Sequence, residues 1–278
     1  METLKSHGIK RLCALFEVSE SAYYAQLKRL KTPAKHTTLS VNIKTIFIES
    51  RSSAGKRTMK AQLAAQGIFI SLYLAAKLMK KMGLCSKQPQ KWRDHSKDGG
   101  KRFDNVLDRQ FTPDKGTTVL CGDTTYIKIN GLWCYLAVVI NLNNRQVVGW
   151  KLSNRHDAQL VVDALNHAML NLSRTETILF HSDQGSIYGS DLFTACVNKH
   201  GLTQSMSRRG NCWDNAPMER WFRSFKWEWM ASGGYRTFES AVTDVKDYVM
   251  YYNYTRPHRY NNGLPPVFTK TTYSGLLN

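Results

Sequence analysis

Three β-rich runs separated by two very short turns constrain the fold more than any other part of the chain. The runs are VLCGDTTYIKI (119–129), residues 133–142 and QVVGWKL (146–152), and the turns are Asn130-Gly131 and Asn143-Asn144. Turns this short connect neighbouring antiparallel strands. The sequence therefore predicts a three-stranded antiparallel meander.

Helices and short strands alternate after the meander. Residues 157–170 predict a helix, because their apolar side chains follow one helix face: Ala158, Val161, Val162, Leu165, Ala168 and Met169. The run 177–180 predicts a buried strand, residues 190–200 a helix that ends at Gly201, and residues 202–207 a short strand. A last helix is expected to open at Ala216-Pro217, with Asp214 or Asn215 as N-cap. This order indicates a mixed α/β domain.

Three carboxylates occupy unusual places in these elements. Asp123 lies in the middle of the first run, on the face that alternation gives to apolar residues, where an acid is out of place for simple packing. Asp183 follows the run 177–180 in His181-Ser182-Asp183, at the strand edge where ligands of α/β sheets bind. Glu219 lies at the start of the last helix.

The three acids together favour a metal site over separate structural roles. Alone, Asp183 can cap a turn, Glu219 can favour a helix N-terminus, and Asp123 can pair with a lysine. Brought together without a counterion they would repel one another. Oxygen ligands suit Mg²⁺ or Mn²⁺, and two such ions support phosphodiester chemistry. Because that chemistry needs no protein base, His181 is expected to support the site or contact DNA.

The charge distribution indicates a nucleic-acid partner. Lys and Arg total 39 against 21 Asp and Glu, for a net charge of +18. Residues 1–102 hold 21 of these cations and 6 acids, whereas residues 103–278 hold 18 and 15. A solvated lysine-rich face would explain a modest excess, but not one concentrated in a third of the chain. A basic arm that binds phosphates explains it better.

Helical patterns in the basic arm predict two helix-turn-helix units. Residues 12–30 form two short patterns around 17–21. In the second unit Gly67 ends a helix that begins near Arg57, and Ser71 caps the next helix, which ends at Gly83. Its outward lysines are DNA-contact candidates: Lys77, Lys80 and Lys81. The alternative is a helical bundle that only connects domains. Residues 31–40 and 86–102 are predicted linkers.

Cysteine usage and hydropathy set the expected compartment. The six cysteines form no C-x-x-C pair, which indicates reduced thiols. A zinc site is not favoured, because the spacing of the four residues considered for it matches no local ligand pair: His7, Cys13, His36 and Cys85. The sequence shows no signal peptide and no run of membrane-spanning length. A soluble, cytoplasmic protein without membrane association is expected.

Asp183 and Glu219 have 35 residues between them, and with Asp123 they match the D,D(35)E spacing of retroviral integrases and many bacterial transposases. The motifs GDTTYI, LAVVINLNNRQVVGW, HSDQGSIY, SMSRRGNCWDNAPMERWF and YYNYTRPH narrow the match. From about residue 40 onward the chain resembles the second-reading-frame (OrfB) transposases of two-frame bacterial insertion sequences. It departs from their usual pattern at Gly122 and Asn141, neither of which belongs to the acid triad.

The resemblance implies a ribonuclease H-like (integrase catalytic core) fold, a mixed five-strand sheet with flanking helices, preceded by basic all-α helix-turn-helix segments. It implies that Asp123, Asp183 and Glu219 bind two Mg²⁺ or Mn²⁺ ions, and that metal-activated water cuts one strand, whose 3′-hydroxyl then attacks DNA. The implied partners are terminal-repeat and target DNA, the first-reading-frame (OrfA) product or a fusion with it, and further copies of the chain on DNA. The resemblance also implies a bacterial cytoplasmic protein that is associated with the nucleoid when bound to DNA.

The expected domains are 1–38, a small helical segment; 39–100, a helix-turn-helix domain and linker; 101–235, the catalytic core; and 236–278, a C-terminal helix and tail. Further phosphate contacts are expected from Arg208, Arg209, Arg223 and Lys226. In the tail, Arg256 and His258 either contact DNA or belong to a segment that covers the core. Two other functions stay open, a non-catalytic DNA-binding regulator and a stand-alone metal-dependent nuclease.

Overall fold

The computed structural model describes residues 8–31, 36–87, 101–113, 116–172, 177–208 and 215–269. The chain divides into two compact units, residues 1–45 and 46–278. Within the described ranges no helix is long and apolar enough to cross a membrane. The predicted linker 86–102 falls largely outside these ranges, and so does Arg209.

The first unit contains the two short helices predicted for residues 12–30. They are α1 (Ile9–Leu15) and α2 (Glu20–Lys31), and the Ser19 hydroxyl accepts a hydrogen bond from the Ala22 N–H at 3.2 Å. The expected linker 31–40 is wrong at its end, because α3 spans Thr37–Glu49 and crosses the boundary between the units. The apolar spacing of Leu39, Ile43 and Ile46 extends the helical pattern back into the end of the expected linker.

The second predicted helix-turn-helix is confirmed. Helix α4 spans Lys56–Ala65, Gly67 adopts φ 78° in the turn, and α5 spans Leu72–Lys81. The Ser71 hydroxyl accepts a hydrogen bond from the Leu74 N–H at 3.1 Å, which satisfies one unpaired donor at the start of α5. The inner face of α5 is buried (Ala75, Leu78, Met79), while Lys77, Lys80 and Lys81 are exposed.

The meander opens a five-stranded mixed sheet with the order β3-β2-β1-β4-β5. Its strands are β1 (Thr117–Ile129), β2 (Leu132–Asn141), β3 (Val147–Ser153), β4 (Thr177–Ser182) and β5 (Thr203–Met206). β2 pairs antiparallel with both β1 and β3, as predicted, whereas β4 pairs parallel with β1 and β5. The central strand is therefore β1, which carries Asp123.

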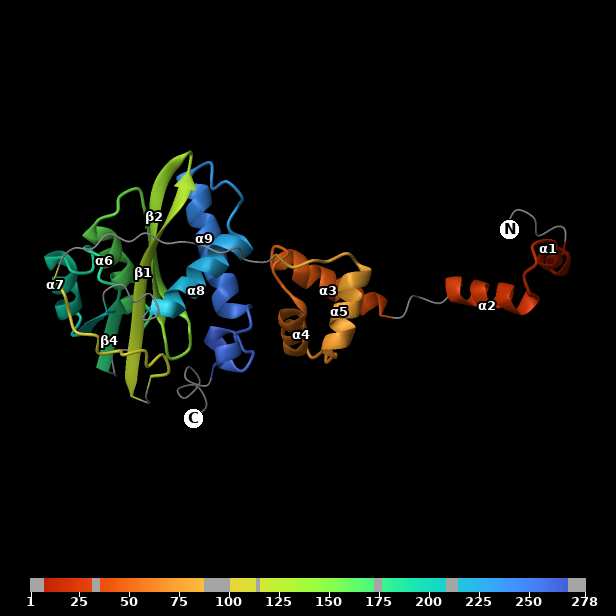
Figure 1. Ribbon diagram of the computed structural model, residues 1–278, viewed down its shortest axis with the longest axis horizontal. Coiled ribbons are helices and arrows are strands. Elements are labelled where there is room, and N and C mark those ends of the chain that lie inside the picture. The colour runs from red at the N-terminus through yellow and green to blue at the C-terminus, as the bar shows by residue number, and fades with distance from the viewer. Residues whose placement is uncertain are drawn as a thin grey trace. The chain divides into compact units, whose positions relative to one another are not determined.

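Helices cover both faces of the sheet (Figure 1). α6 (Ala158–Leu170) and α7 (Asp191–Lys199) bury their apolar sides with Phe180 in one core. α8 (Ala216–Ser224) contributes Trp221 to the other core and α9 (Phe238–Tyr254) contributes Tyr248, together with Phe225, which directly follows α8. α9, which was expected in a separate C-terminal segment, thus shares a core with β1. Two short 3₁₀ segments follow it, Arg259–Asn261 and Pro266–Phe268.

Two glycines allow close packing against the sheet. A Cβ at Gly149 would lie 2.3 Å from the Ala164 carbonyl oxygen, so α6 can approach β3 only because this side chain is absent. A Cβ at Gly122 would lie 2.4 Å from Cζ of Phe180. The unusual Gly122 thus makes room for an aromatic ring directly beside the catalytic candidate Asp123.

The α3–α4 turn contacts the C-terminal helices within the second unit. Arg51 adopts φ 51°, forms an ion pair with Asp244 of α9, and stacks 4.2 Å from the centre of the Trp229 ring. Its Nη1 also donates to the Trp229 carbonyl at 3.1 Å, and Gln62 donates to the Thr255 carbonyl at 3.2 Å. A cation with both a carboxylate and an aromatic partner stabilises this contact more than a single exposed pair would.

Candidate active site

Asp123 and Asp183 lie at the same level of two adjacent strands. Cys121 of β1 is paired with His181 of β4 in the parallel register, and each aspartate follows its paired residue by two positions. The charges of both carboxylates also affect the pKa of one buried phenol, that of Tyr188. The pKa of Tyr188 is raised well above its ordinary value, first by burial and then by the charges of Asp123 and Asp183. The structure therefore brings these two predicted acids together.

A buried amide orients the Asp123 carboxylate. Oδ1 accepts the Thr124 N–H at 2.7 Å, and Oδ2 accepts the Asn215 side-chain N–H at 3.0 Å. The amide oxygen of Asn215 in turn accepts a hydrogen bond from the Cys121 thiol at 2.9 Å. Burial, followed by the charge of Asp123, raises the pKa of that thiol, so it stays protonated and remains a donor. Hydrogen bonds to both oxygens thus hold the carboxylate in this orientation relative to β1.

Asn215 also ties the start of α8 to this carboxylate. It is the N-cap residue of α8, but its side chain makes no capping hydrogen bond because both of its polar ends are used at Asp123 and Cys121. The other cap candidate, Asp214, lies outside the described residues. Glu219 is exposed four positions after Asn215, and residues at this spacing lie on one side of a helix. The helix that carries the third acid is therefore held beside the first.

The loop after β4 orients Asp183. Its Oδ1 accepts the Gly185 N–H at 3.0 Å. A Cβ on Gly185 would lie 2.9 Å from the same oxygen, so a larger residue would crowd the carboxylate.

His181 is fully buried under this loop. The Ser205 hydroxyl accepts the N–H groups of Val106 and Leu107 at 3.0 and 3.2 Å, so it donates its own proton to His181 Nδ1 at 2.9 Å. Nε2 then carries the imidazole proton and faces the Ser207 hydroxyl at 3.3 Å. A neutral imidazole in this position joins β4 to β5 and has no exposed surface for DNA. Its support of the acids stays a prediction.

His156, which the sequence did not single out, lies close to the same site. It follows β3, faces the Thr124 hydroxyl at 3.1 Å, and stacks on Tyr135 with ring centres 4.7 Å apart. Its pKa is lowered mainly by burial, against the opposing charges of Asp183 and Asp157. The sequence alone could not indicate a role for His156, because a single histidine in a polar turn matches no motif and its contact with Thr124 forms only in the folded chain.

The predicted phosphate contacts are distributed around the site. Arg208 is exposed and pairs with Asp108, and Arg223 is exposed on α8. Lys226 lies 4.5 Å from the ring centre of Tyr126 on β1. These positions are compatible with phosphate binding but do not test it.

Arg256 and His258 are used inside the protein. Arg256 makes hydrogen bonds to both oxygens of Glu228 at 2.9–3.2 Å. His258 is buried against Tyr252, and burial together with the charge of Arg256 lowers its pKa to about 3. Of the two hypotheses for this segment, the contacts favour the one in which it covers the core.

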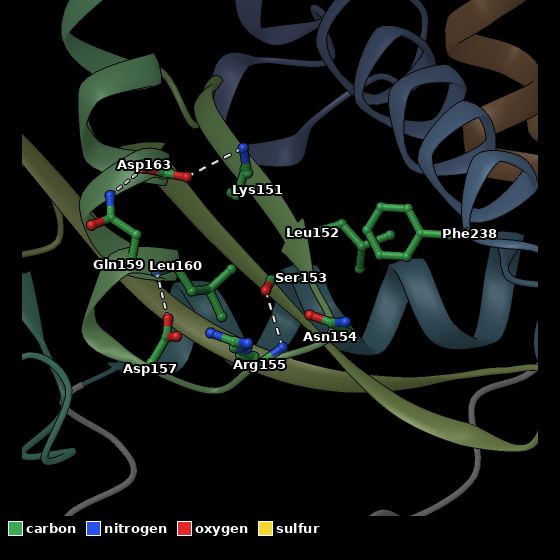
Figure 2. Close-up of a pocket in the computed structure, with 10 residues that line it drawn as sticks. All are labelled: Lys151, Leu152, Ser153, Asn154, Arg155, Asp157, Gln159, Leu160, Asp163 and Phe238. Carbon is green, nitrogen blue, oxygen red and sulfur yellow. Dashed lines mark hydrogen bonds and ion pairs between the residues drawn. The ribbon is translucent and has the colours of Figure 1, made fainter.

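A surface pocket is lined by residues that flank His156 in the sequence. Figure 2 shows it between β3 and the start of α6, where Lys151 pairs with Asp163 at 3.2 Å and Gln159 donates to the same carboxylate at 2.6 Å. None of its lining residues belongs to the predicted triad. Lys151 and Asp163 already pair with each other and the Asp157 side chain caps α6, so the candidate active site remains the region around Asp123.

The described residues contain no group of three His, Cys, Asp or Glu side chains arranged to hold a metal ion. Asp123 and Asp183 meet, and Glu219 lies on a helix anchored to Asp123, but the convergence of all three stays a prediction.

Known protein families match both parts of the chain. Residues 113–212 and 200–266 match the Integrase core domain, and residues 35–92 match an HTH-like domain. The putative transposase InsK for insertion sequence element IS150 of Escherichia coli (strain K12) is 30% identical over 274 residues, which cover 98% of this chain and 97% of that protein. The chain belongs to the insertion-sequence transposases. Transposase InsF for insertion sequence IS3A of the same strain is 30% identical over 93% of this chain and 92% of its own length.

These matches and the sheet order confirm the predicted ribonuclease H-like fold and helix-turn-helix segment of this transposase. Among solved structures, the catalytic core domain of BIV integrase is 16% identical, covers 53% of this chain and 90% of that one, and has a TM-score of 0.42.

Proposed function

We propose that this transposase cuts DNA at the ends of its element and joins them to target DNA by phosphoryl transfer at Asp123, Asp183 and Glu219. The observation that carries the proposal is the hydrogen bond from Asn215 to Asp123, which holds the Glu219 helix beside two aspartates at one level of the sheet. The D,D(35)E spacing and the family support the same assignment.

The donor set fits Mg²⁺ or Mn²⁺. All three groups offer hard oxygen ligands, and hydrogen bonds orient the carboxylates of Asp123 and Asp183. Two bound ions would supply activated water and stabilise the leaving oxygen. The chain's own contribution is to hold the carboxylates in place before DNA arrives, because Asn215, Thr124 and Gly185 direct them. His181 supports β4 beneath Asp183.

Cationic groups around the site would position DNA. The exposed lysines of α5 (Lys77, Lys80, Lys81) suit recognition of the terminal repeats, while Arg208, Arg209, Arg223 and Lys226 suit phosphates near the acids. Pairing two ends requires further copies of the chain on DNA, and the first-frame product is a proposed partner. The four-part division at residues 38, 100 and 235, and a cytoplasmic, nucleoid-associated location, belong to the same proposal.

A strand-transfer assay with labelled element ends and plasmid tests the mechanism. Asp123→Asn, Asp183→Asn and Glu219→Gln should each lower joining more than about a hundredfold in Mg²⁺, because each removes a ligand for ions that contribute several kcal/mol. Asp191→Asn is the control, since that exposed carboxylate pairs only with Lys101 among the contacts described. Joining that survives in the triad variants would contradict the assignment.

The same assay separates the rival functions. Joined products indicate a transposase, cut ends without joining indicate a nuclease, and a gel shift without chemistry indicates a regulator. Running it with and without the first-frame product tests that partnership.

A further inference from the structure

The β1–β2 hairpin extends beyond the rest of the sheet. β4 accompanies β1 only from Thr117 to Cys121, whereas β2 accompanies it to Ile129. Past Cys121, the only pairing of β1 on the β4 side within the described ranges is a bridge between Ile129 and Tyr235, and from Cys134 to Leu132 β2 is no longer paired with β3. This part of the hairpin is a ribbon that begins at the candidate active site and leads away from it.

One side of the ribbon carries alternating rings and cations. Tyr126 and Trp133 meet edge to face with centres 4.9 Å apart. Lys128 lies directly opposite Trp133 in the register, and its Nζ is 5.3 Å from the centre of that ring. Lys226, in the turn that follows α8, has its Nζ 4.5 Å from the centre of the Tyr126 ring. We call Tyr126, Lys128 and Trp133 the hairpin face.

Hairpin stability alone does not account for this face. Cross-strand aromatic pairs stabilise ribbons, which explains the contact between Tyr126 and Trp133. It does not explain why the Trp133 side chain remains 52% exposed, with a lysine beside it and no acid between residues 124 and 136. An exposed ring with cations beside it is the arrangement that proteins use to bind unpaired nucleic acid, because bases stack on the ring while the cations neutralise phosphates.

The distance to the acids suits a strand that passes through the active site. Lys128, opposite Trp133, is five positions from Asp123, which is about 17 Å along an antiparallel strand. Thr124 and Tyr126 occupy the same side in between, and His156 lies against Thr124. Asp123 alternates to the opposite face of β1, so a DNA strand that leaves the carboxylates would pass around the edge of β1 that β4 no longer pairs after Cys121 and then meet the hairpin face.

We propose that the hairpin face binds an unpaired DNA strand next to the active site, with a base stacked on Trp133 and phosphates held by Lys128 and Lys226. The proposal rests on the function proposed above, since it names the DNA form that this site holds. Unpaired DNA is favoured over duplex because stacking requires a base whose own π-face is free.

The test is the affinity of the full chain for two fluorescent probes, an oligothymidylate of about 20 nucleotides and a random duplex of the same length. Trp133→Ala should weaken binding of oligothymidylate about tenfold and leave duplex binding unchanged, because loss of one stacked base has an effect of this size. Trp133→Phe should retain most of the affinity. Lys128→Ala should weaken oligothymidylate binding and reduce its salt dependence.

Leu132→Ala is the matched control. Leu132 is 70% exposed in the same hairpin but alternates to the other side of β2, so its removal should change neither probe. Equal losses on both probes, equal losses in Leu132→Ala, or no loss in Trp133→Ala would overturn the proposal. Circular dichroism confirms that each variant is folded. Since binding requires no catalysis, failure of the triad assay and failure of this proposal give separate results.

Discussion

Asn215 donates its side-chain N–H to Asp123 Oδ2 at 3.0 Å, from a position where the residue opens α8 and is only 4% exposed. A side chain that would ordinarily cap its own helix is instead used between two elements 92 residues apart. The position of α8 and the orientation of the Asp123 carboxylate therefore depend on the same amide.

Asn215→Ala should slow DNA cleavage about tenfold and move its Mg²⁺ dependence to higher concentration. The reason is that Asp123 loses one orienting hydrogen bond and the Cys121 thiol loses its acceptor, each change being worth about 1 kcal/mol. Cleavage rates measured over a Mg²⁺ titration check this. Asn198→Ala, at an exposed position of α7, is the control. An unchanged Mg²⁺ dependence would show that Asn215 acts only on stability.

Gly122→Ala should destabilise the core by about 1–3 kcal/mol, because the new methyl group overlaps the Phe180 ring. Phe180→Leu is itself destabilising, but in that background the cost of Gly122→Ala should be smaller. Urea unfolding of the four proteins in this double-mutant cycle gives the coupling. Gly55→Ala is the matched control, since its Cβ would only touch Ser86 at 3.5 Å. Additive effects would mean that the chain accommodates the methyl group elsewhere.

Acid should destabilise the protein through His258. Burial and the charge of Arg256 lower its pKa from 6.5 to about 3, so the folded chain leaves this imidazole neutral where the unfolded chain protonates it. The unfolded state then binds more protons between about pH 3 and 6.5, and stability falls as pH drops through that window. The loss between pH 7 and pH 5 is about 2 kcal/mol.

The check is the free energy of unfolding at pH 7 and pH 5. In His258→Gln the difference should shrink by most of that amount, whereas exposed His167→Gln should keep the wild-type dependence. If the two variants behave alike, the acid sensitivity has another origin.

Lys77→Ala and Lys80→Ala should weaken binding to element-end DNA and reduce the slope of log affinity against log salt by about 0.9 for each phosphate that is no longer neutralised. Both lysines are exposed on α5, the second helix of the helix-turn-helix. Fluorescence anisotropy at several salt concentrations measures the slope. Lys60→Ala, exposed on α4, serves as the comparison. A wild-type slope in both α5 variants would exclude this face from DNA binding.

Much of the fold was predictable, because local patterns specified it. Short turns determined the antiparallel pairing of β1, β2 and β3, and Ser71 marked the start of α5. Asp123 and Asp183 could be placed together because each lies on a strand or directly after one. Asn215 could be predicted only as a cap, since nothing local shows that its amide reaches a strand far away in sequence.

Three other features could not be predicted from local sequence patterns. Trp221, Phe225 and Trp229 fit an α-helical face, yet the last turn is a π-helix (Phe225–Trp229). Residues 37–40 looked like part of a linker because most of them are polar and they follow a proline, but Leu39 continues the apolar pattern of the helix after them. His156 acquires its neighbours only when β3 and β1 are in one sheet.

The π-helical turn makes the length of this segment critical. The Met230 N–H bonds the Phe225 carbonyl five residues back at 2.9 Å, so the turn holds one residue more than an α-helical turn would. Deleting one residue there would restore regular winding but rotate the following chain by about 100°. Lys226 would then leave Tyr126, or Trp229 would leave Arg51. The additional residue in this turn thus lets one helical segment place Lys226 against Tyr126 and Trp229 against Arg51.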